Sequence, residues 1–379
     1  MNNRILIVGG GICGLTSALA LQQKQIDFVV FEAVPEIKTV GAGITLAGNA
    51  MRVLKKLGAD EEVKQKGHLI SSMLINDDNG KIISFMDAEK ISRKHGLDNI
   101  AIHRAELHKA LLKNIPSKKI ITNKKAISYE AKPEGVIIHY EDGSFTEGMA
   151  AIVADGINSS IRKKLLPHTI PRYSGYTCWR GVVENIWNLQ HHAVETWGPQ
   201  GRFGYVPIGN NKVYWFACKN AKQNDEALKK YSVTDLVSNF KSYNQPIPSI
   251  LESTRASELI WSDIIDLKPI ARFAYGRVLL MGDAAHATTP NLGQGACMAM
   301  EDAIHVAHEL EQHKADVANA FTSFESKRIA RTHYIVNASY RLGKLAQAEN
   351  AFGIKLRNAL FRAIPNWVNE RQMARMLDI

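Results

Sequence analysis

The 379-residue sequence predicts an α/β fold in three parts: a discontinuous βαβ-type domain, an antiparallel β-sheet domain inserted into it, and a helical C-terminal tail. Short apolar runs followed by glycine turns open the chain and return near residue 276. Aromatic-rich alternating runs, such as residues 203–207 and 213–218, fill the stretch between them. The 45% apolar fraction is ordinary for a folded globular protein.

The first element is a strand, glycine turn, helix and strand over residues 4–31. The glycine turn matches the GxGxxG pattern through Gly9, Gly11 and Gly14. These glycines permit a tight turn, close approach of a pyrophosphate and close helix packing. Glu32 follows the second strand, where an acid binds a ribose hydroxyl. A Rossmann-like dinucleotide-binding unit is therefore expected, and by itself it fits FAD or NAD.

The following elements set the domain boundaries. Asn49 is expected to cap a helix ending near Gly58, and residues 77–80 and 141–143 are expected to be hairpin turns. Residues 1–172 form the first part of the dinucleotide-binding domain, with a small β insertion near 69–100. Residues 173–268 form a substrate domain, 269–330 the second part of the dinucleotide-binding domain, and 331–379 the C-terminal helices.

Two further motifs follow strands; the first is by itself a common turn, and the residue types of the second suit a flavin. One begins at Asp155 and Gly156, after a buried strand, and ends at Arg162. The other follows the strand before Gly282, begins with Asp283, and continues to a loop containing Pro290, Gly293 and Gly295. An acid can hold ribitol hydroxyls, and a helix N-terminus that begins at glycine offers N–H groups to the negative charge of a reduced flavin.

In this order and spacing, the three motifs resemble those of the class A FAD-dependent monooxygenases, the aromatic-hydroxylase family. The resemblance covers essentially the whole chain and implies non-covalent FAD, NADPH or NADH as co-substrate, and a sheet domain over the flavin ring. It also implies individual roles. The residues implied to serve the cofactor, besides those of the first motif, are Gly43 in the loop 41–44 beside the isoalloxazine, Arg104, Asp155, Gly156, Arg162, Asp283, Pro290, Gly293 and Gly295.

The expected activity is hydroxylation of a small aromatic or heteroaromatic substrate with O₂ through a flavin C4a-hydroperoxide. Cofactor chemistry carries such a reaction, so the sequence demands no catalytic side chain. His286 is expected to serve packing and hydrogen bonding. The alternatives are an FAD-dependent reductase or dehydrogenase without oxygen transfer, a tetracycline-type antibiotic-inactivating monooxygenase, and a flavin-binding protein without turnover.

For the substrate, the chain resembles bacterial FAD-dependent urate hydroxylases, and next the zeaxanthin epoxidase-like enzymes. Arg202 and Tyr214 stand where the urate enzymes have a substrate-binding arginine and tyrosine, and strand alternation would let both point inward. Asn291 stands where those enzymes have an acid, and an amide cannot supply its charge. Another heteroaromatic or phenolic substrate is therefore equally compatible. An aromatic wall is expected from some of Trp179, Tyr205, Trp215 and Phe216, with the others in the core.

Composition limits the other partners. The net charge of +10 is scattered, without a basic stripe interleaved with aromatics, so no nucleic-acid partner is expected. The four cysteines lack metal spacing, and no metal site is expected. We expect a cytoplasmic monomer or weak dimer. Residues 325–379 carry ten Lys/Arg and four Asp/Glu. The apolar residues of the last helix, Phe352, Leu356, Leu360 and Ile364, are expected to pack on the FAD domain rather than to bind a membrane.

Overall fold

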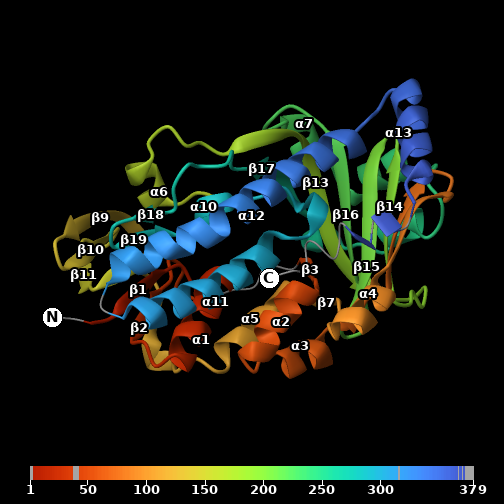
Figure 1. The fold of residues 1–379 in the computed structure, drawn as a ribbon. Helices are drawn as coiled ribbons and strands as arrows, with labels where there is room; N and C mark the ends of the chain where they lie inside the picture. The colour runs from red at the N-terminus through yellow and green to blue at the C-terminus, as the bar shows by residue number, and fades with distance from the viewer. Residues whose placement is uncertain (1–2, 37–41, 315, 366, 369, 372–379) are drawn as a thin grey trace.

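The computed structural model describes residues 3–36, 42–314, 316–365, 367–368 and 370–371. Two sheets dominate it, and the long helix α12 passes from one to the other (Figure 1). Gly41, part of the expected flavin loop, lies outside the described residues. Of the described helices, none has the length and apolarity needed to cross a membrane.

The first sheet has six strands and holds the glycine motifs at its strand ends. Four of its five strand pairings are parallel, while β18 pairs antiparallel with β19. In order across the sheet the strands are β18 (Ala274–Tyr275), β19 (Val278–Leu280), β12 (Ala150–Val153), β1 (Ile5–Val8), β2 (Phe28–Phe31) and β8 (Ile120–Ile121). Parallel strands bring their carboxyl ends to one edge, so three loops distant in sequence meet there.

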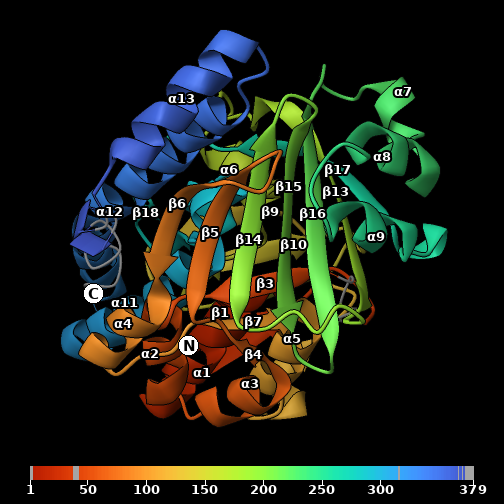
Figure 2. The same cartoon turned by 90° about the vertical axis from the view of Figure 1, so that its right-hand side faces the viewer.

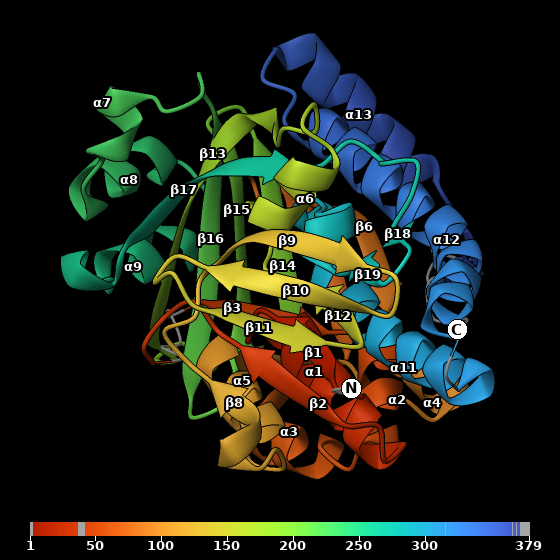
Figure 3. The same cartoon turned by 90° about the vertical axis from the view of Figure 1, so that its left-hand side faces the viewer.

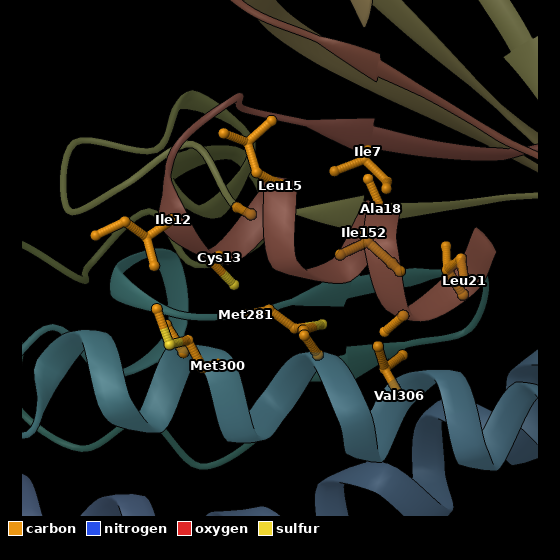
Figure 4. Close-up of a cluster of buried hydrophobic side chains, with 14 of the residues drawn as sticks. Ile7, Ile12, Cys13, Leu15, Ala18, Leu21, Ile152, Met281, Met300 and Val306 are labelled. Atoms are coloured by element: carbon orange, nitrogen blue, oxygen red, sulfur yellow. The ribbon is translucent and has the colours of Figure 1, made fainter. Parts of the chain in front are cut away.

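Helices α1 (Ile12–Gln23) and α11 (Gly295–His313) pack against each other beside this sheet. Figure 4 shows the contact, with Leu15 and Ala18 of α1, Ile152 of β12 and Met300 of α11 in one apolar cluster. The three-stranded antiparallel sheet of β9 (Ala126–Lys132), β10 (Gly135–Tyr140) and β11 (Phe145–Gly148) lies beside the six-stranded sheet (Figure 3). The predicted turn at 141–143 joins β10 to β11.

The second sheet has seven strands and separates a helical layer from the cavity described below. Its strands, in order, are β17 (Ile260–Asp266), β13 (Arg172–Glu184), β16 (Lys212–Asn220), β15 (Gly201–Ile208), β14 (His192–Gly198), β5 (Ser72–Asp77) and β6 (Ile82–Asp87). Helices α7 (Glu226–Lys229), α8 (Val233–Phe240) and α9 (Ile247–Glu252) cover one face (Figure 2). The hairpin near residues 69–100 thus extends this sheet through a parallel β5–β14 pairing.

The remaining elements complete the two layers. A small sheet consists of β3 (Gly43–Leu46), β7 (Ile100–His103) and β4 (His68–Leu69). The other helices are α2 (Gly48–Lys56), α3 (Asp60–Lys66), α4 (Ala88–His95), α5 (Arg104–Leu112), α6 (Ser160–Leu165), α10 (Asp283–His286), α12 (Val317–Ala346) and α13 (Ala351–Ala363), with 3-10 turns η1 (Ser117–Lys119), η2 (Ala256–Glu258) and η3 (Pro290–Leu292). The predicted fold class, with its inserted sheet and helical tail, is confirmed.

Two local expectations are wrong. Ala47, not Asn49, occupies the cap of α2, and Asn49 lies inside the helix with a buried side chain. The last helix, α13, packs beside β6, but three of its four apolar residues expected to pack, Phe352, Leu356 and Leu360, are exposed. In both cases the tertiary contact decides the position, because a polar side chain finds buried partners that the local sequence does not show.

Candidate active site

A cavity of about 390 Å³ lies between the loops of the six-stranded sheet and the open face of the seven-stranded sheet. It brings together residues predicted from separate motifs. Those predicted residues that line it are Gly11, Gly43, Arg104, Gly156, Asp283, Pro290, Asn291, Gly293 and Gly295, together with Arg202 and Tyr214 from the seven-stranded sheet. Gly9, Gly14, Glu32, Asp155 and Arg162 lie around this lining rather than in it.

The first glycine loop combines crowded and open positions. A Cβ on Gly14 would lie 1.9 Å from the Gly9 carbonyl oxygen, and one on Gly9 would lie 2.4 Å from the Ala154 oxygen. Gly9 also has φ +106°, which favours glycine. A Cβ on Gly11, by contrast, would meet no protein atom within 4 Å. The turn is thus closed beneath and open toward the cavity, as a pyrophosphate requires.

Glu32 lies against this loop at the end of β2. One carboxylate oxygen accepts a hydrogen bond from the Gly10 N–H at 2.6 Å, and the other accepts one from the Val34 N–H at 3.0 Å. A carboxylate oxygen has two lone pairs, so each keeps one for a ligand hydroxyl. The position therefore suits the ribose contact expected from the sequence.

The second motif has an acid with one unpartnered oxygen and a buried cation. Burial raises the pKa of Asp155, although a hydrogen bond with Ser159 opposes the rise. Its Oδ1 atom is buried without a hydrogen-bond partner among the described residues. Arg162 is fully buried and donates to the Ala284 carbonyl at 3.2 Å and to the Ile157 carbonyl. Arg162 therefore ties the second motif to the third.

The third motif places an acid in the cavity. Asp283 lines the cavity with an accessible side chain, and desolvation by the surrounding protein raises its pKa against the opposing effect of His286 and Arg104. Gly282, at φ +55°, turns the chain after β19. Beyond it, Gly295 begins α11, so the N–H end of this 19-residue helix lies at the cavity. A negatively charged ring edge would be stabilised there.

A buried charged network behind this motif was not predicted. Asp302, on α11, accepts hydrogen bonds from His286 at 2.6 Å, from the Gly282 N–H at 3.2 Å and from Arg328 at 2.8 Å. His286 is buried and does not line the cavity, as its expected packing role requires. The available signal was the acidic pair Glu301 and Asp302 inside the otherwise apolar run of residues 296–304.

Asn49 and Gln294 position the loop before α11. The Asn49 amide donates to Gln294 Oε1 at 2.9 Å and to Glu301 Oε1 at 2.6 Å. All three side chains are buried. The GQG segment is therefore held by a side-chain network from α2, which no local pattern indicated.

Strand register builds the opposite wall. Across the sheet, Cys178 of β13, Cys218 of β16 and Arg202 of β15 are directly opposite one another. One step along the same face, Arg180 lies opposite Phe216. All of these residues line the cavity, as does Tyr214. The predicted inward orientation of Arg202 and Tyr214 follows from the alternation of strand residues.

Arg202 is already paired within the protein. Its side chain is 3% exposed, donates to Gln347 at 2.7 Å, and forms an ion pair with Glu195 at 3.1 Å. Its guanidinium also lies 5.1 Å from the Tyr176 ring centroid. Glu195 lines the cavity too. The positive charge of Arg202 is therefore compensated before any substrate enters.

The side chain of Asn291 also has hydrogen-bond partners within the protein. Its amide nitrogen donates to Thr289 at 2.8 Å and to the Ser339 carbonyl at 2.9 Å, and its oxygen accepts a hydrogen bond from Tyr176 at 3.2 Å. A Cβ on Gly343 would lie 2.4 Å from the amide nitrogen, so α12 approaches closely. Asn291 thus connects the cavity to α12.

Sequence reasoning missed Arg180 and the two thiols. Arg180 donates to Ser262 at 2.6 Å and forms no ion pair with a carboxylate among the described residues. Although burial disfavours the thiolate, a hydrogen bond with Cys218 and the charges of Arg180 and Arg202 lower the pKa of Cys178 to about 7. Of the proposed aromatic wall, Phe216 lines the cavity, whereas Trp179, Tyr205 and Trp215 are buried in the core beneath it.

The fold and the glycine loops define the class of this protein: a dinucleotide-binding α/β enzyme with a substrate sheet over the cofactor. The family described as FAD binding domain matches residues 2–339, and the chain belongs to it. It is an FAD-dependent monooxygenase of the aromatic-hydroxylase type, and NAD(P)H is the co-substrate typical of the family. The reductase alternative is set aside accordingly.

Three similar proteins span nearly the whole chain. Aurachin C monooxygenase/isomerase of Stigmatella aurantiaca is 38% identical over 94% of this chain and 93% of its own length. The 2-heptyl-3-hydroxy-4(1H)-quinolone synthase of Pseudomonas aeruginosa is 31% identical over 98% of this chain and 97% of its own. A Klebsiella pneumoniae enzyme solved with FAD and uric acid is 26% identical, with a TM-score of 0.91 over 99% of this chain and 96% of that one.

The residues present fit FAD. The open side of Gly11, the unpartnered oxygen of Asp155, the cavity-facing Asp283 and the N-terminus of α11 are the contacts that an extended dinucleotide needs. When bound, FAD supplies the chemistry of hydride acceptance and oxygen activation. These residues would bind and orient it, and the seven-stranded sheet lies across the cavity from the cofactor loops.

Proposed function

We propose that this enzyme hydroxylates an uncharged bicyclic heteroaromatic, a 4-quinolone with an apolar substituent. The observation that carries the proposal is the compensated charge of Arg202, since Glu195 already forms its ion pair. A substrate carboxylate or other anion would have to displace Glu195 or leave it unpaired, and an unpaired buried charge is costly. Asn291 adds no charge either. Arg202 and Asn291 therefore offer no free charge to an anionic substrate, and a neutral ring needs none from them.

The cavity lining supports a ring with polar atoms at one edge. Ile44, Phe216 and the thiols of Cys178 and Cys218 offer apolar or polarisable contact. Arg180 donates one hydrogen bond to Ser262 and retains further donors for a ring carbonyl oxygen. Two of the similar proteins described above are named as an aurachin C monooxygenase/isomerase and a 2-heptyl-3-hydroxy-4(1H)-quinolone synthase, and these names agree with this chemistry.

The roles proposed for the side chains are binding and orientation. Arg180 would hold the ring oxygen, Tyr214 and Phe216 would flank the ring plane, and Asp283 and Arg104 would contact the cofactor. Asp155 and Gly156 would lie beside the pyrophosphate, with Arg162 fixing their loop. No side chain is assigned a proton transfer, because oxygen transfer to an electron-rich carbon depends on the cofactor and on position.

A substrate screen tests the proposal. The holoenzyme is mixed with NADH or NADPH and, separately, with 2-heptyl-4-quinolone, urate, 3-hydroxybenzoate, salicylate and tetracycline. We expect the quinolone to stimulate NAD(P)H oxidation by at least about tenfold over the other compounds, which corresponds to roughly 1.4 kcal/mol of transition-state discrimination. Its product should be heavier by one oxygen atom. Stronger coupled hydroxylation of urate or of an aromatic acid would refute the proposal.

A further inference from the structure

Helix α13 turns a stripe of apolar side chains outward and buries two polar side chains. Arg357 and Asn358 are 5% and 7% exposed and face the protein. Phe352, Leu356 and Leu360, at successive i, i+4 positions, are 78%, 50% and 58% exposed. A surface helix normally buries its apolar stripe. We call these three exposed residues the α13 face.

Buried contacts fix the helix in this orientation. Arg357 donates to the Ala346 carbonyl at 2.9 Å and to the Trp197 carbonyl at 3.4 Å, with its guanidinium 5.1 Å from the Trp197 ring. Phe361 packs edge-on against Trp197 at 5.2 Å. Arg362 pairs with Asp77 at 2.7 Å at the other end. Rotating the α13 face inward would break all of these contacts, so its exposure is built into the fold.

We propose that the α13 face is a docking surface for an anionic phospholipid bilayer. On α13 and just beyond it, Lys355, Arg362 and Arg371 are exposed cations, and Arg362 also pairs with Asp77. Lys355 is exposed between Phe352 and Leu356, and the exposed Trp367 follows the helix. Long apolar and aromatic side chains with adjacent cations are typical of helices that lie in the interface of anionic membranes.

A second protein molecule fits this surface less well. Protein interfaces exclude lysine from their apolar centres, whereas a lipid headgroup layer accepts it. Lys355 lies directly beside Leu356, within the apolar stripe. The combination of a narrow apolar stripe and exposed cations therefore favours a lipid headgroup layer.

Helix α13 is connected to the part of the seven-stranded sheet that lines the cavity. Ala346, which accepts the Arg357 hydrogen bond, precedes Gln347, and Gln347 accepts the hydrogen bond of Arg202 in the cavity. Figure 2 shows α13 along the edge of the seven-stranded sheet that lies beside β6. If the proposed function holds, an apolar substituent would partition into the bilayer, and docking would bring the cavity close to that supply.

Vesicle cosedimentation of the holoenzyme, without substrate, tests the docking separately from the proposed function. Vesicles of phosphatidylcholine alone are compared with phosphatidylcholine mixed with phosphatidylglycerol. We expect binding to the mixed vesicles and at least about tenfold weaker binding after Phe352→Ser, Leu356→Ser and Leu360→Ser are combined. Lys355→Glu alone should weaken binding to the mixed vesicles by a smaller factor.

A matched triple variant controls for the loss of exposed apolar area. Phe145, Ile170 and Ile186 are 64%, 75% and 72% exposed and lie outside α13. Changing them to serine should leave vesicle binding unchanged. Flavin absorbance and the thermal midpoint verify folding of every variant, and Lys355→Glu, a surface change, provides the test if the α13 triple variant does not fold. The proposal is overturned if the wild type binds none of the mixed vesicles, or if the α13 variants bind them as tightly as the wild type. It is also overturned if the wild type binds no lipid and instead forms a dimer that the α13 triple variant does not form.

Discussion

The two sides of the cavity are built in different ways. The cofactor side consists of loops at the ends of β1, β12 and β19, where backbone groups and glycines form the surface. The substrate side consists of side chains from β13, β15 and β16, placed by strand register. A surface made of backbone atoms restricts which residues can occupy its positions, so it can be recognised in the sequence as a motif. A side-chain surface can be altered residue by residue, so it carries specificity.

The largest expected effect lies on the cofactor side, within one glycine loop. Gly14→Ala puts a Cβ 1.9 Å from the Gly9 oxygen, so we expect loss of more than about 4 kcal/mol of folding stability or no folded protein. Gly11→Ala meets no protein atom. It should therefore give a folded apoprotein with a nearly unchanged thermal midpoint and strongly reduced FAD affinity. Thermal unfolding measures the stability of each variant, and flavin titration measures its FAD affinity. Equal behaviour of the two variants would contradict a glycine loop that is open only at Gly11.

The second effect concerns the network behind the cofactor loops. Burial alone would raise the pKa of Asp302, but His286 and Arg328 hold it well below its ordinary value of 3.8. Asp302→Asn should lower the free energy of unfolding by about 3 kcal/mol at pH 7 because a buried pair is broken. A pKa lowered by folding stabilises the protein above the unfolded-state pKa of about 4, and this contribution is lost as the pH falls toward the folded value. Denaturant unfolding should show the difference between wild type and variant narrowing below about pH 4. A constant difference would argue against an ionised Asp302.

The third effect separates the two sides. Arg202→Ala changes the substrate wall without touching a cofactor loop, so flavin content should stay unchanged. Substrate stimulation of NAD(P)H oxidation should fall by roughly tenfold, equivalent to about 1.4 kcal/mol, because the wall loses a packed guanidinium. Steady-state kinetics with flavin quantitation measure this. Loss of FAD together with stimulation would mean that the two sides are not independent.

The smallest expected effect tests whether the Glu195–Arg202 ion pair sets the preference for neutral substrates. Glu195→Gln leaves Arg202 without its carboxylate partner, so an anionic aromatic acid should gain a few-fold in kcat/KM while the quinolone changes little. Glu184→Gln, at an exposed pair with Lys212, is the matched control and should change neither. If Glu195→Gln leaves the ranking of anionic and neutral compounds unaltered, compensation of Arg202 does not set specificity.

Prediction from sequence succeeded where local geometry determines the structure. Gly9, Gly11 and Gly14 are required by contacts within one turn, so their spacing alone located the loop. Arg162 was recognised, but only the fold places it between two loops as a buried tie. Arg180 and Glu195 were missed because nothing local separates them from the other polar residues of alternating strands.

The sequence by itself determined the cofactor class, because three glycine-containing loops must each fit a backbone to a phosphate or a ring, and such close fits restrict the residue type. It also determined the fold class through its periodicity. Only the tertiary structure decided that Arg202 is neutralised by Glu195, that Asn291 is bound to α12, and that α13 turns Phe352 and Leu356 outward. These outcomes depend on partners far apart in the chain, whose meeting is set by register and packing rather than by any local pattern.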